Sequence, residues 1–66
     1  MIEIKVNGNK IFTKETQLDN YIFSIKKNIE GIIVAYNSEV IQKKEWNSIN
    51  LKNGDVIDIF HFVGGG

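Results

Sequence analysis

The side chains that could support catalysis are few and scattered along this sequence of 66 residues. Catalysis by side chains needs a nucleophile, an acid–base group or a metal ion. The single histidine, His61, shares a strand phase with Ile57 and Ile59, which is typical of a structural histidine at the end of a sheet. No serine has a histidine and a carboxylate in a recognisable pattern, no carboxylates show metal-ligand spacing, and cysteine is absent. The sequence therefore predicts neither an independent enzyme nor a metal site, and we expect no bound cofactor.

The glycines at the end of the sequence offer a different kind of chemistry. The turn signal Asn53-Gly54-Asp55 precedes an apolar strand that runs directly into Gly64, Gly65 and Gly66. Glycine cannot pack and loses the most entropy on ordering, so residues 63–66 are predicted to form a flexible glycine tail. Such a tail can thread a narrow channel, and its terminal carboxylate becomes reactive once ATP converts it to an acyl-adenylate that sulfur or an amine can attack. By composition alone, an idle chain end or a cloning remnant explains the glycines equally well.

The composition argues against several other roles. The eight basic residues are all lysine, and they balance eight acidic residues. Nucleic-acid binding is disfavoured, because phosphate and base recognition depend on net positive charge and on arginine. No apolar run approaches the roughly 20 residues of a membrane span, and the N-terminus lacks the basic and apolar blocks of a signal peptide. We therefore expect one small cytoplasmic domain over residues 1–66, without a membrane or nucleic-acid partner.

Hydrophobic periodicity predicts one amphipathic helix between short strands. The apolar residues that share one helix face are Leu18, Ile22, Ile25 and Ile29. Thr16 is the expected N-cap, and Lys26 and Lys27 are expected in the last turns, where the helix dipole favours positive charge. Gly31 or the asparagine at position 28 is expected to end the helix.

Alternating and short apolar runs predict the strands around this helix. They cover residues 1–7, 10–14, 32–36 and 40–41, followed by the final strand from Val56 onward. The turn signals Asn7-Gly8-Asn9 and Asn37-Ser38 separate two pairs of these strands. Trp46 lies in an irregular polar segment and is expected to cover one end of the core.

This order of elements predicts an α+β fold with one main helix on one face of a mixed sheet. The first and last strands are both strongly apolar in one phase, so we expect them side by side in the middle of the sheet. A last strand beside the first, after a helical crossover, is the β-grasp arrangement. If the helix covers the face of Ile57 and Ile59, then Val56, Phe60 and Phe62 lie on the open face. Exposed aromatic residues next to a reactive tail would form an apolar dock for partner enzymes, unless loops cover them.

The sequence resembles the sulfur carrier proteins of thiamine biosynthesis, the ThiS family, over its full length and most specifically in its second half. The residues that carry this resemblance, in spacing as well as type, are Val34-Ala35-Tyr36-Asn37, Val40-Ile41, Trp46, Leu51, Gly54-Asp55, Ile57-Asp58-Ile59-Phe60 and Val63-Gly64-Gly65-Gly66. The resemblance implies a ubiquitin-like β-grasp fold with a C-terminal glycine tail.

The resemblance also implies a function for the tail. A ThiF-like adenylating enzyme would use Mg-ATP to adenylate the carboxylate of Gly66. Sulfur from a persulfide donor, such as a cysteine desulfurase, would then replace AMP and leave a terminal thiocarboxylate. Gly65 carries over as the other terminal glycine, and Gly64 occupies a position that is usually small. A ThiG-like thiazole synthase would take the sulfur to build thiazole, so the chain is expected to act as a protein cosubstrate.

Three alternatives remain open at the level of sequence. The small subunit of molybdopterin synthase shares the fold, the tail and the activation chemistry, although its chains are usually longer and tend to carry prolines where this one has His61-Phe62. A ubiquitin-like modifier would form an amide with target lysines through Gly66. A plain interaction module would leave the tail idle.

Overall fold

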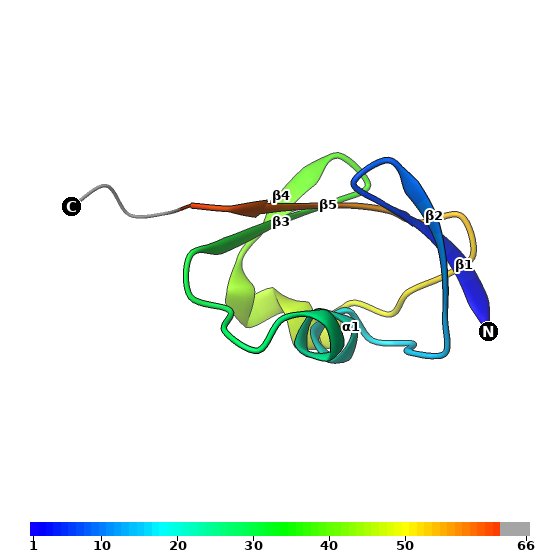
Figure 1. The fold of residues 1–66 in the computed structure, drawn as a ribbon, viewed down its shortest axis with the longest axis horizontal. Coiled ribbons are helices and arrows are strands. Elements are labelled where there is room, and N and C mark those ends of the chain that lie inside the picture. Colours follow the sequence, from blue (N-terminus) through cyan, green and yellow to red (C-terminus); the bar gives the residue numbers. More distant parts are fainter. Residues whose placement is uncertain (63–66) are drawn as a thin grey trace.

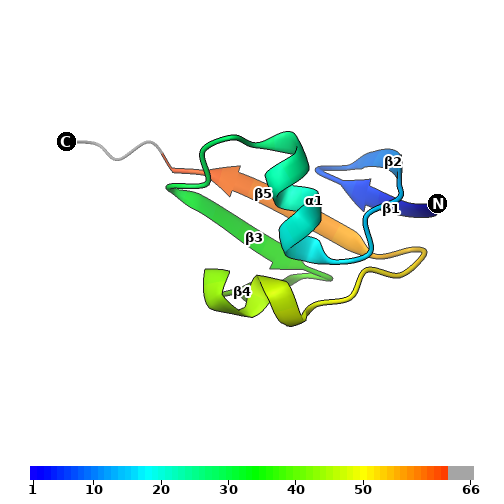
Figure 2. The same ribbon diagram turned by 90° about the horizontal axis from the view of Figure 1, so that it is seen from below.

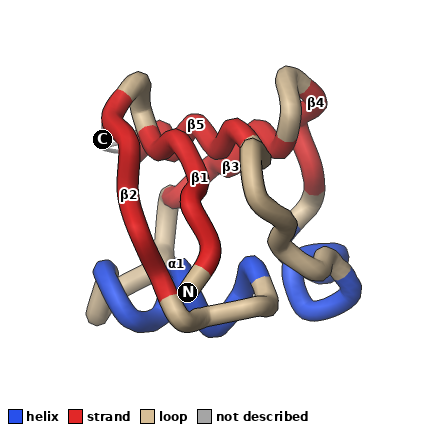
Figure 3. Tube along the Cα trace, turned by 90° about the vertical axis from the view of Figure 1, so that its right-hand side faces the viewer, coloured by secondary structure: helices blue, strands red, loops and turns tan. Residues whose placement is uncertain are grey.

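The structure is a computed structural model that describes residues 1–62 of the chain. The elements in this range, in chain order, are β1 (Ile2–Val6), β2 (Asn9–Thr13), α1 (Leu18–Ile25), β3 (Ile32–Tyr36), β4 (Glu39–Ile41), the 3₁₀ helix η1 (Lys43–Ser48) and β5 (Val56–His61). They pack as two layers, with the sheet on one side and both helical segments on the other (Figures 1 and 3). No helix in the described part is long and apolar enough to cross a membrane.

The strands form one mixed sheet in the order β2-β1-β5-β3-β4. β5 lies in the middle, parallel to β1 and antiparallel to β3, as the shared apolar phase of the terminal strands predicts. α1 crosses the face formed by β5 and β3 (Figure 2). The described residues therefore have the predicted α+β architecture. The prediction of a flexible tail concerns residues 63–66, which lie outside the described residues.

The two hairpins turn through residues in the left-handed region. In the β1–β2 turn, φ is 50° at Asn7 and 83° at Gly8. In the β3–β4 turn, φ is 50° at Asn37 and 73° at Ser38. Two consecutive residues with positive φ match the right-handed twist of the flanking strands, which is why asparagine and glycine suit these turns. Ser38 takes the same conformation with a Cβ, which costs free energy.

A single core fills the space between the two layers. Its buried apolar side chains are Ile4, Val6, Leu18, Tyr21, Ile22, Val34, Trp46, Leu51 and Ile57. Trp46 covers the core as predicted, with only 2% of its surface exposed. Its segment is, however, a 3₁₀ helix and not the irregular stretch expected, and the indole Nε1 has no hydrogen-bond partner among the described residues.

The predicted N-cap of the helix is wrong by one residue. Gln17 precedes the first helical residue, and no side chain caps the helix, so Thr16 is not the N-cap. The reason is a contact with a distant segment: the backbone N–H of Leu18 donates to the carbonyl of Ile49, and Gln17 forms a β-bridge with Asn50. These bonds occupy the helix start and replace a side-chain cap.

The predicted end of the helix is also too late. α1 stops at Ile25, and Lys26 already has extended backbone angles, so Lys26 and Lys27 lie outside the last turn. Ile25 is 45% exposed and does not belong to the buried face, while Ile29 packs against the core from the following loop. The buried helix face consists instead of Leu18, Tyr21 and Ile22, which have i, i+3, i+4 spacing.

Candidate functional site

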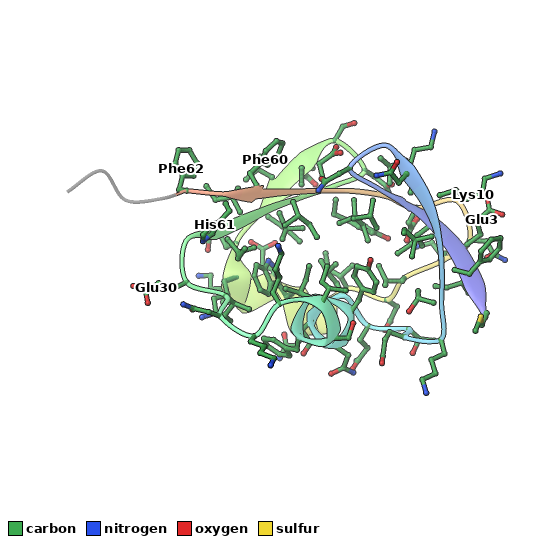
Figure 4. The ribbon with its side chains drawn as sticks, in the orientation of Figure 1. Glu3, Lys10, Glu30, Phe60, His61 and Phe62 are labelled. Atoms are coloured by element: carbon green, nitrogen blue, oxygen red, sulfur yellow. The ribbon has the colours of Figure 1, made fainter. Side chains whose placement is uncertain are left out.

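The end of β5 presents two aromatic side chains on the open face of the sheet. Phe60 and Phe62 point away from the helix layer, while His61 points toward it (Figure 4). Phe60 is 53% exposed and Phe62 is 65% exposed. This confirms the predicted strand phase, because Ile57 is fully buried on the opposite face.

The third residue predicted for this face is less accessible. Val56 lies in register with Lys5 of β1 and is only partly exposed. Phe60 lies opposite Ile33 of β3, which is also partly exposed. We refer to Val56, Phe60 and Phe62 as the aromatic face, and its most exposed part lies at the end nearest the glycine tail.

The last described residue of the chain is held by one residue on a neighbouring loop. The backbone N–H of Phe62 donates to the carbonyl oxygen of Gly31 at 2.9 Å. Gly31 has a φ of +78°, a conformation that glycine adopts without steric cost. Gly64, Gly65 and Gly66, which carry the predicted chemistry, lie outside the described residues.

The other end of β5 begins at a buried carboxylate. Asp55 is only 6% exposed and accepts three hydrogen bonds. The hydroxyl of Tyr36 and the backbone N–H of Lys52 donate to its Oδ2 at 2.7 and 2.8 Å. The side-chain amide of Asn37 donates to its Oδ1 at 3.3 Å. Every oxygen of the carboxylate therefore has a partner, as a buried charge requires.

These contacts change the acidity of both titratable groups. Burial raises the pKa of Asp55, but the hydrogen bonds from Tyr36, the Lys52 backbone and Asn37, together with the Lys52 charge, outweigh it. The pKa of Asp55 therefore lies below its ordinary value. Burial and the hydrogen bond to Asp55 raise the pKa of the Tyr36 hydroxyl. Asp55 is thus ionised and held in place at neutral pH, which is the behaviour of a structural group.

Two turn asparagines tie β5 to its neighbours. The side-chain oxygen of Asn37 accepts from the backbone N–H of Val56 at 2.7 Å. The side-chain oxygen of Asn7 accepts from the backbone N–H of Ile59, also at 2.7 Å. The turns thus do more than reverse the chain, because their side chains continue the hydrogen bonding of the sheet.

The described residues contain no constellation for side-chain catalysis. Residues 1–62 hold no group of three histidine or acidic residues placed to bind a metal, and no small-molecule pocket forms among them. His61 is exposed at the end of β5, in register with Ile32, and within residues 1–62 its ring has no hydrogen bond to an acid or a nucleophile. What the arrangement offers is a strand end beside exposed apolar side chains.

Sequence reasoning missed the residues that act through distant contacts. The sequence predicts Gly31 only as a helix end, yet it lies against Phe62. It presents Asp55 as part of a turn signal and of the family resemblance, and does not predict a buried carboxylate. The polar identity of Asp55 directly before an apolar strand is compatible with an ordinary turn. The one usable signal was Gly31 itself, since an isolated glycine before a strand can mark a close backbone approach.

Comparisons with known proteins agree with this geometry. The family model described as "ThiS family" matches residues 3–66. The sulfur carrier protein ThiS of Bacillus subtilis (strain 168) is 34% identical over 65 residues, covering 96% of this chain and 98% of the relative. The uncharacterized protein ycf40 of Trieres chinensis is 32% identical over 62 residues, covering 92% of this chain and 85% of the relative.

A solved structure shows the same fold. The crystal structure of the thiamine biosynthesis protein ThiS from Geobacter metallireducens superimposes with a TM-score of 0.83, covering 98% of this chain and all of the other. Its identity of 23% supports the fold alone, which is the ubiquitin-like β-grasp expected from the sequence. The family model and the Bacillus relative cover nearly the whole chain, and the chain therefore belongs to the ThiS family of small sulfur carrier proteins.

Proposed function

We propose that this chain carries sulfur for thiamine biosynthesis as a thiocarboxylate on the carboxyl group of Gly66. The observation that carries the proposal is the family match, which extends through the terminal glycines to residue 66. Members of this family are protein cosubstrates that act with partner enzymes, and the described residues of this chain hold no catalytic constellation of their own. The chemistry therefore falls to the tail and to the enzymes that bind it.

The proposed reaction proceeds in three balanced steps. A carboxylate oxygen of Gly66 attacks the α-phosphorus of ATP in an adenylating enzyme, and pyrophosphate leaves; Mg²⁺ and ATP belong to that enzyme. The terminal sulfur of a persulfide donor attacks the acyl carbon, and AMP leaves. A thiol then cleaves the resulting acyl disulfide, which releases the thiocarboxylate and a disulfide. Glycine suits these steps because a tail without side chains fits a narrow channel.

The partners of this chemistry bind, in our proposal, at the aromatic face. The family as a whole works with an adenylating enzyme and a thiazole synthase. Here the ThiF-like and ThiG-like partners would contact Phe60 and Phe62, and the rim of the contact would include Val56. Aromatic residues, phenylalanine among them, are enriched at protein interfaces relative to the rest of the surface. Their position at the tail end of β5 supports a contact beside the channel that, in this proposal, would receive Gly64 and Gly65.

Intact mass spectrometry tests the proposal directly. The protein is incubated with the adenylating enzyme of the same organism, ATP, Mg²⁺, a cysteine desulfurase with cysteine as persulfide source, and a thiol. We expect a mass gain equal to the exchange of one oxygen for sulfur. A variant without Gly65 and Gly66 should fold equally well and show no gain, and a variant with one serine added after Gly66 should also fail.

Other outcomes point to other functions. An adenylate without a thiocarboxylate would favour a ubiquitin-like modifier, and the absence of both would favour an idle tail on an interaction module. A thiocarboxylate that thiazole synthase refuses, but that supplies sulfur in a complex with the large subunit of molybdopterin synthase, would assign the sulfur to the molybdopterin pathway. Each of these results overturns the proposal at a different step.

A further inference from the structure

The contact between Gly31 and Phe62 is closer than any side chain would allow. A Cβ placed on Gly31 would lie 2.6 Å from the backbone carbonyl oxygen of Phe62. That is about 0.8 Å short of ordinary van der Waals contact, which begins near 3.4 Å. The obstacle is a backbone atom, so the contact cannot be relieved by rotating a side chain. Gly31 also binds Phe62 through a hydrogen bond, in which the Phe62 N–H donates to the Gly31 carbonyl oxygen.

This contact distinguishes Gly31 from two other glycines with the same backbone conformation. Gly8 and Gly54 have φ values of +83° and +89°, close to the +78° of Gly31. A Cβ on either of them would meet nothing within 4 Å. All three positions therefore favour glycine for its positive φ, but only Gly31 needs it for close approach to another segment.

The contact also lies where β5 has the least support. In the described residues, the contacts between the β1 side of the sheet and β5 end at Asn7, which bonds to Ile57 and Ile59. Beyond that point β5 has β3 on one side, and its last described backbone bond is the one between Phe62 and Gly31. The orientation of the Phe62 peptide therefore depends on Gly31 more than on any other described residue.

We propose that Gly31 is a positioning residue, which sets the direction in which the glycine tail leaves the sheet and enters the adenylating enzyme. This inference rests on the proposed function. Four residues follow Phe62, so an extended tail reaches at most roughly 14 Å. If the partner's narrow channel keeps the tail extended, a change of about 15° in its starting direction displaces its end by roughly 3–4 Å, whereas a reacting atom must lie within about 3–3.5 Å of its target. Gly31 acts through the Phe62 backbone and touches no reacting group.

Hydrogen exchange on the unmodified protein gives the first test. We expect the Phe62 amide to exchange slowly, with a protection comparable to that of amides inside β5, because its bond to Gly31 must open first. NMR detection on the ¹⁵N-labelled chain measures this without any partner enzyme. An unprotected Phe62 amide beside protected β5 amides would overturn the inference and leave the proposed function standing.

Loading kinetics give the second test, with a matched control. Gly31→Ala and Gly54→Ala introduce the same side chain at the same kind of backbone angle, and only the first presses on Phe62. With the adenylating enzyme of the same organism, ATP-dependent pyrophosphate release should show kcat lowered roughly tenfold to a hundredfold for Gly31→Ala. Its KM should change by a smaller factor than its kcat, because the clash falls on the Phe62 backbone and leaves Val56 and Phe60 of the aromatic face in place. Both variants are assayed at a temperature at which circular dichroism shows them folded.

The outcomes separate positioning from stability. Equal kcat values for Gly31→Ala and Gly54→Ala, with both variants folded, would overturn the inference, as would a loss confined to KM. If Gly31→Ala does not fold at any usable temperature, the amide exchange of Phe62 in the unmodified protein is the test of the inference. A failure of the unmodified protein itself to be adenylated would overturn the proposed function, and the positioning role with it.

Discussion

The two ends of β5 are built on different principles. At its start, a buried carboxylate and the side chains of two turn asparagines bind the strand to its neighbours. At its end, the described contacts are backbone bonds to β3 and to Gly31, and the side chains of Phe60 and Phe62 face solvent. We call these the anchored end and the exit end. The difference indicates that stability is concentrated at the first, which leaves the second free to present apolar surface and the glycine tail.

The strongest test of this comparison replaces Asp55 with asparagine at the anchored end. Asp55→Asn should lower the free energy of unfolding by about 3 kcal/mol, because a buried acceptor with three donors becomes a group that itself carries two N–H donors. Urea unfolding followed by circular dichroism measures the loss. Sulfur loading at a temperature where the variant is still folded should be unchanged.

The control for this variant lies three residues along the chain. Asp58→Asn changes the same chemical group at a partly exposed position, where the described structure gives the side chain no hydrogen bond. It should alter stability by no more than about 0.5 kcal/mol. Similar losses in both variants would mean that the anchored end owes its stability to something other than the Asp55 contacts.

The pH dependence of stability gives a second test of the same contacts. The folded-state pKa of Asp55 is lowered, so the folded chain binds its proton less readily than the unfolded chain. The stabilisation is therefore fully present above the unfolded pKa of about 3.9 and is lost as the pH falls through the lower folded pKa. Urea unfolding from pH 7 to pH 2 should show a difference between the unmodified protein and Asp55→Asn that is constant above about pH 4.5 and shrinks below it. A difference that instead grows toward low pH would contradict this sign.

The exit end is tested by removing its aromatic side chains. Phe60→Ala and Phe62→Ala should each raise the KM for adenylation roughly tenfold, since truncating an aromatic anchor at an interface typically costs more than about 1 kcal/mol. Their stabilities should change by no more than about 0.5 kcal/mol, because both side chains are largely exposed. Steady-state pyrophosphate release and urea unfolding measure the two quantities.

Phe12 provides a matched control for the aromatic face. It is 61% exposed and lies in register with Glu3, one residue out of phase with buried Ile4, so it occupies the same open face. It belongs to the edge strand β2, two strands away from β5. Phe12→Ala should leave the KM unchanged. An equal effect of Phe12→Ala, Phe60→Ala and Phe62→Ala would show that the partner binds exposed apolar surface in general and not the exit end in particular.

The exit end was easier to predict from the sequence than the anchored end. The period of two along β5 is a local signal, and it placed Phe60 and Phe62 on the open face and Ile57 in the core. The role of Asp55 depends on Tyr36, and that of Gly31 on Phe62, so each involves residues far apart in the sequence. The same holds for α1, where bonds to the segment near Ile49 replaced the expected cap at its start. Local patterns carry no information about contacts between distant residues. Strand phase can be predicted without such information, because it depends only on neighbouring residues.

The smallest expected effect concerns the β3–β4 turn at the anchored end. Ser38 has a φ of 73°, so its Cβ imposes a cost that glycine avoids. Ser38→Gly should therefore raise the free energy of unfolding by about 0.5 kcal/mol after the larger backbone entropy of glycine in the unfolded chain is subtracted. Thermal unfolding should then shift upward by roughly 2–4 °C.

The neighbouring residue Glu39 shows what this gain depends on. Glu39→Gly introduces the same residue into β4, where φ is not positive, and should lower stability by about 0.5–1 kcal/mol. Neither variant should alter adenylation, because the turn is remote from the exit end. A stabilised Ser38→Gly with unchanged kcat and KM would show that the two ends of β5 can be tuned independently. A kcat that falls as the anchored end is stabilised would mean that the ends are coupled through the strand, and that the exit end needs some of the freedom that the turn allows.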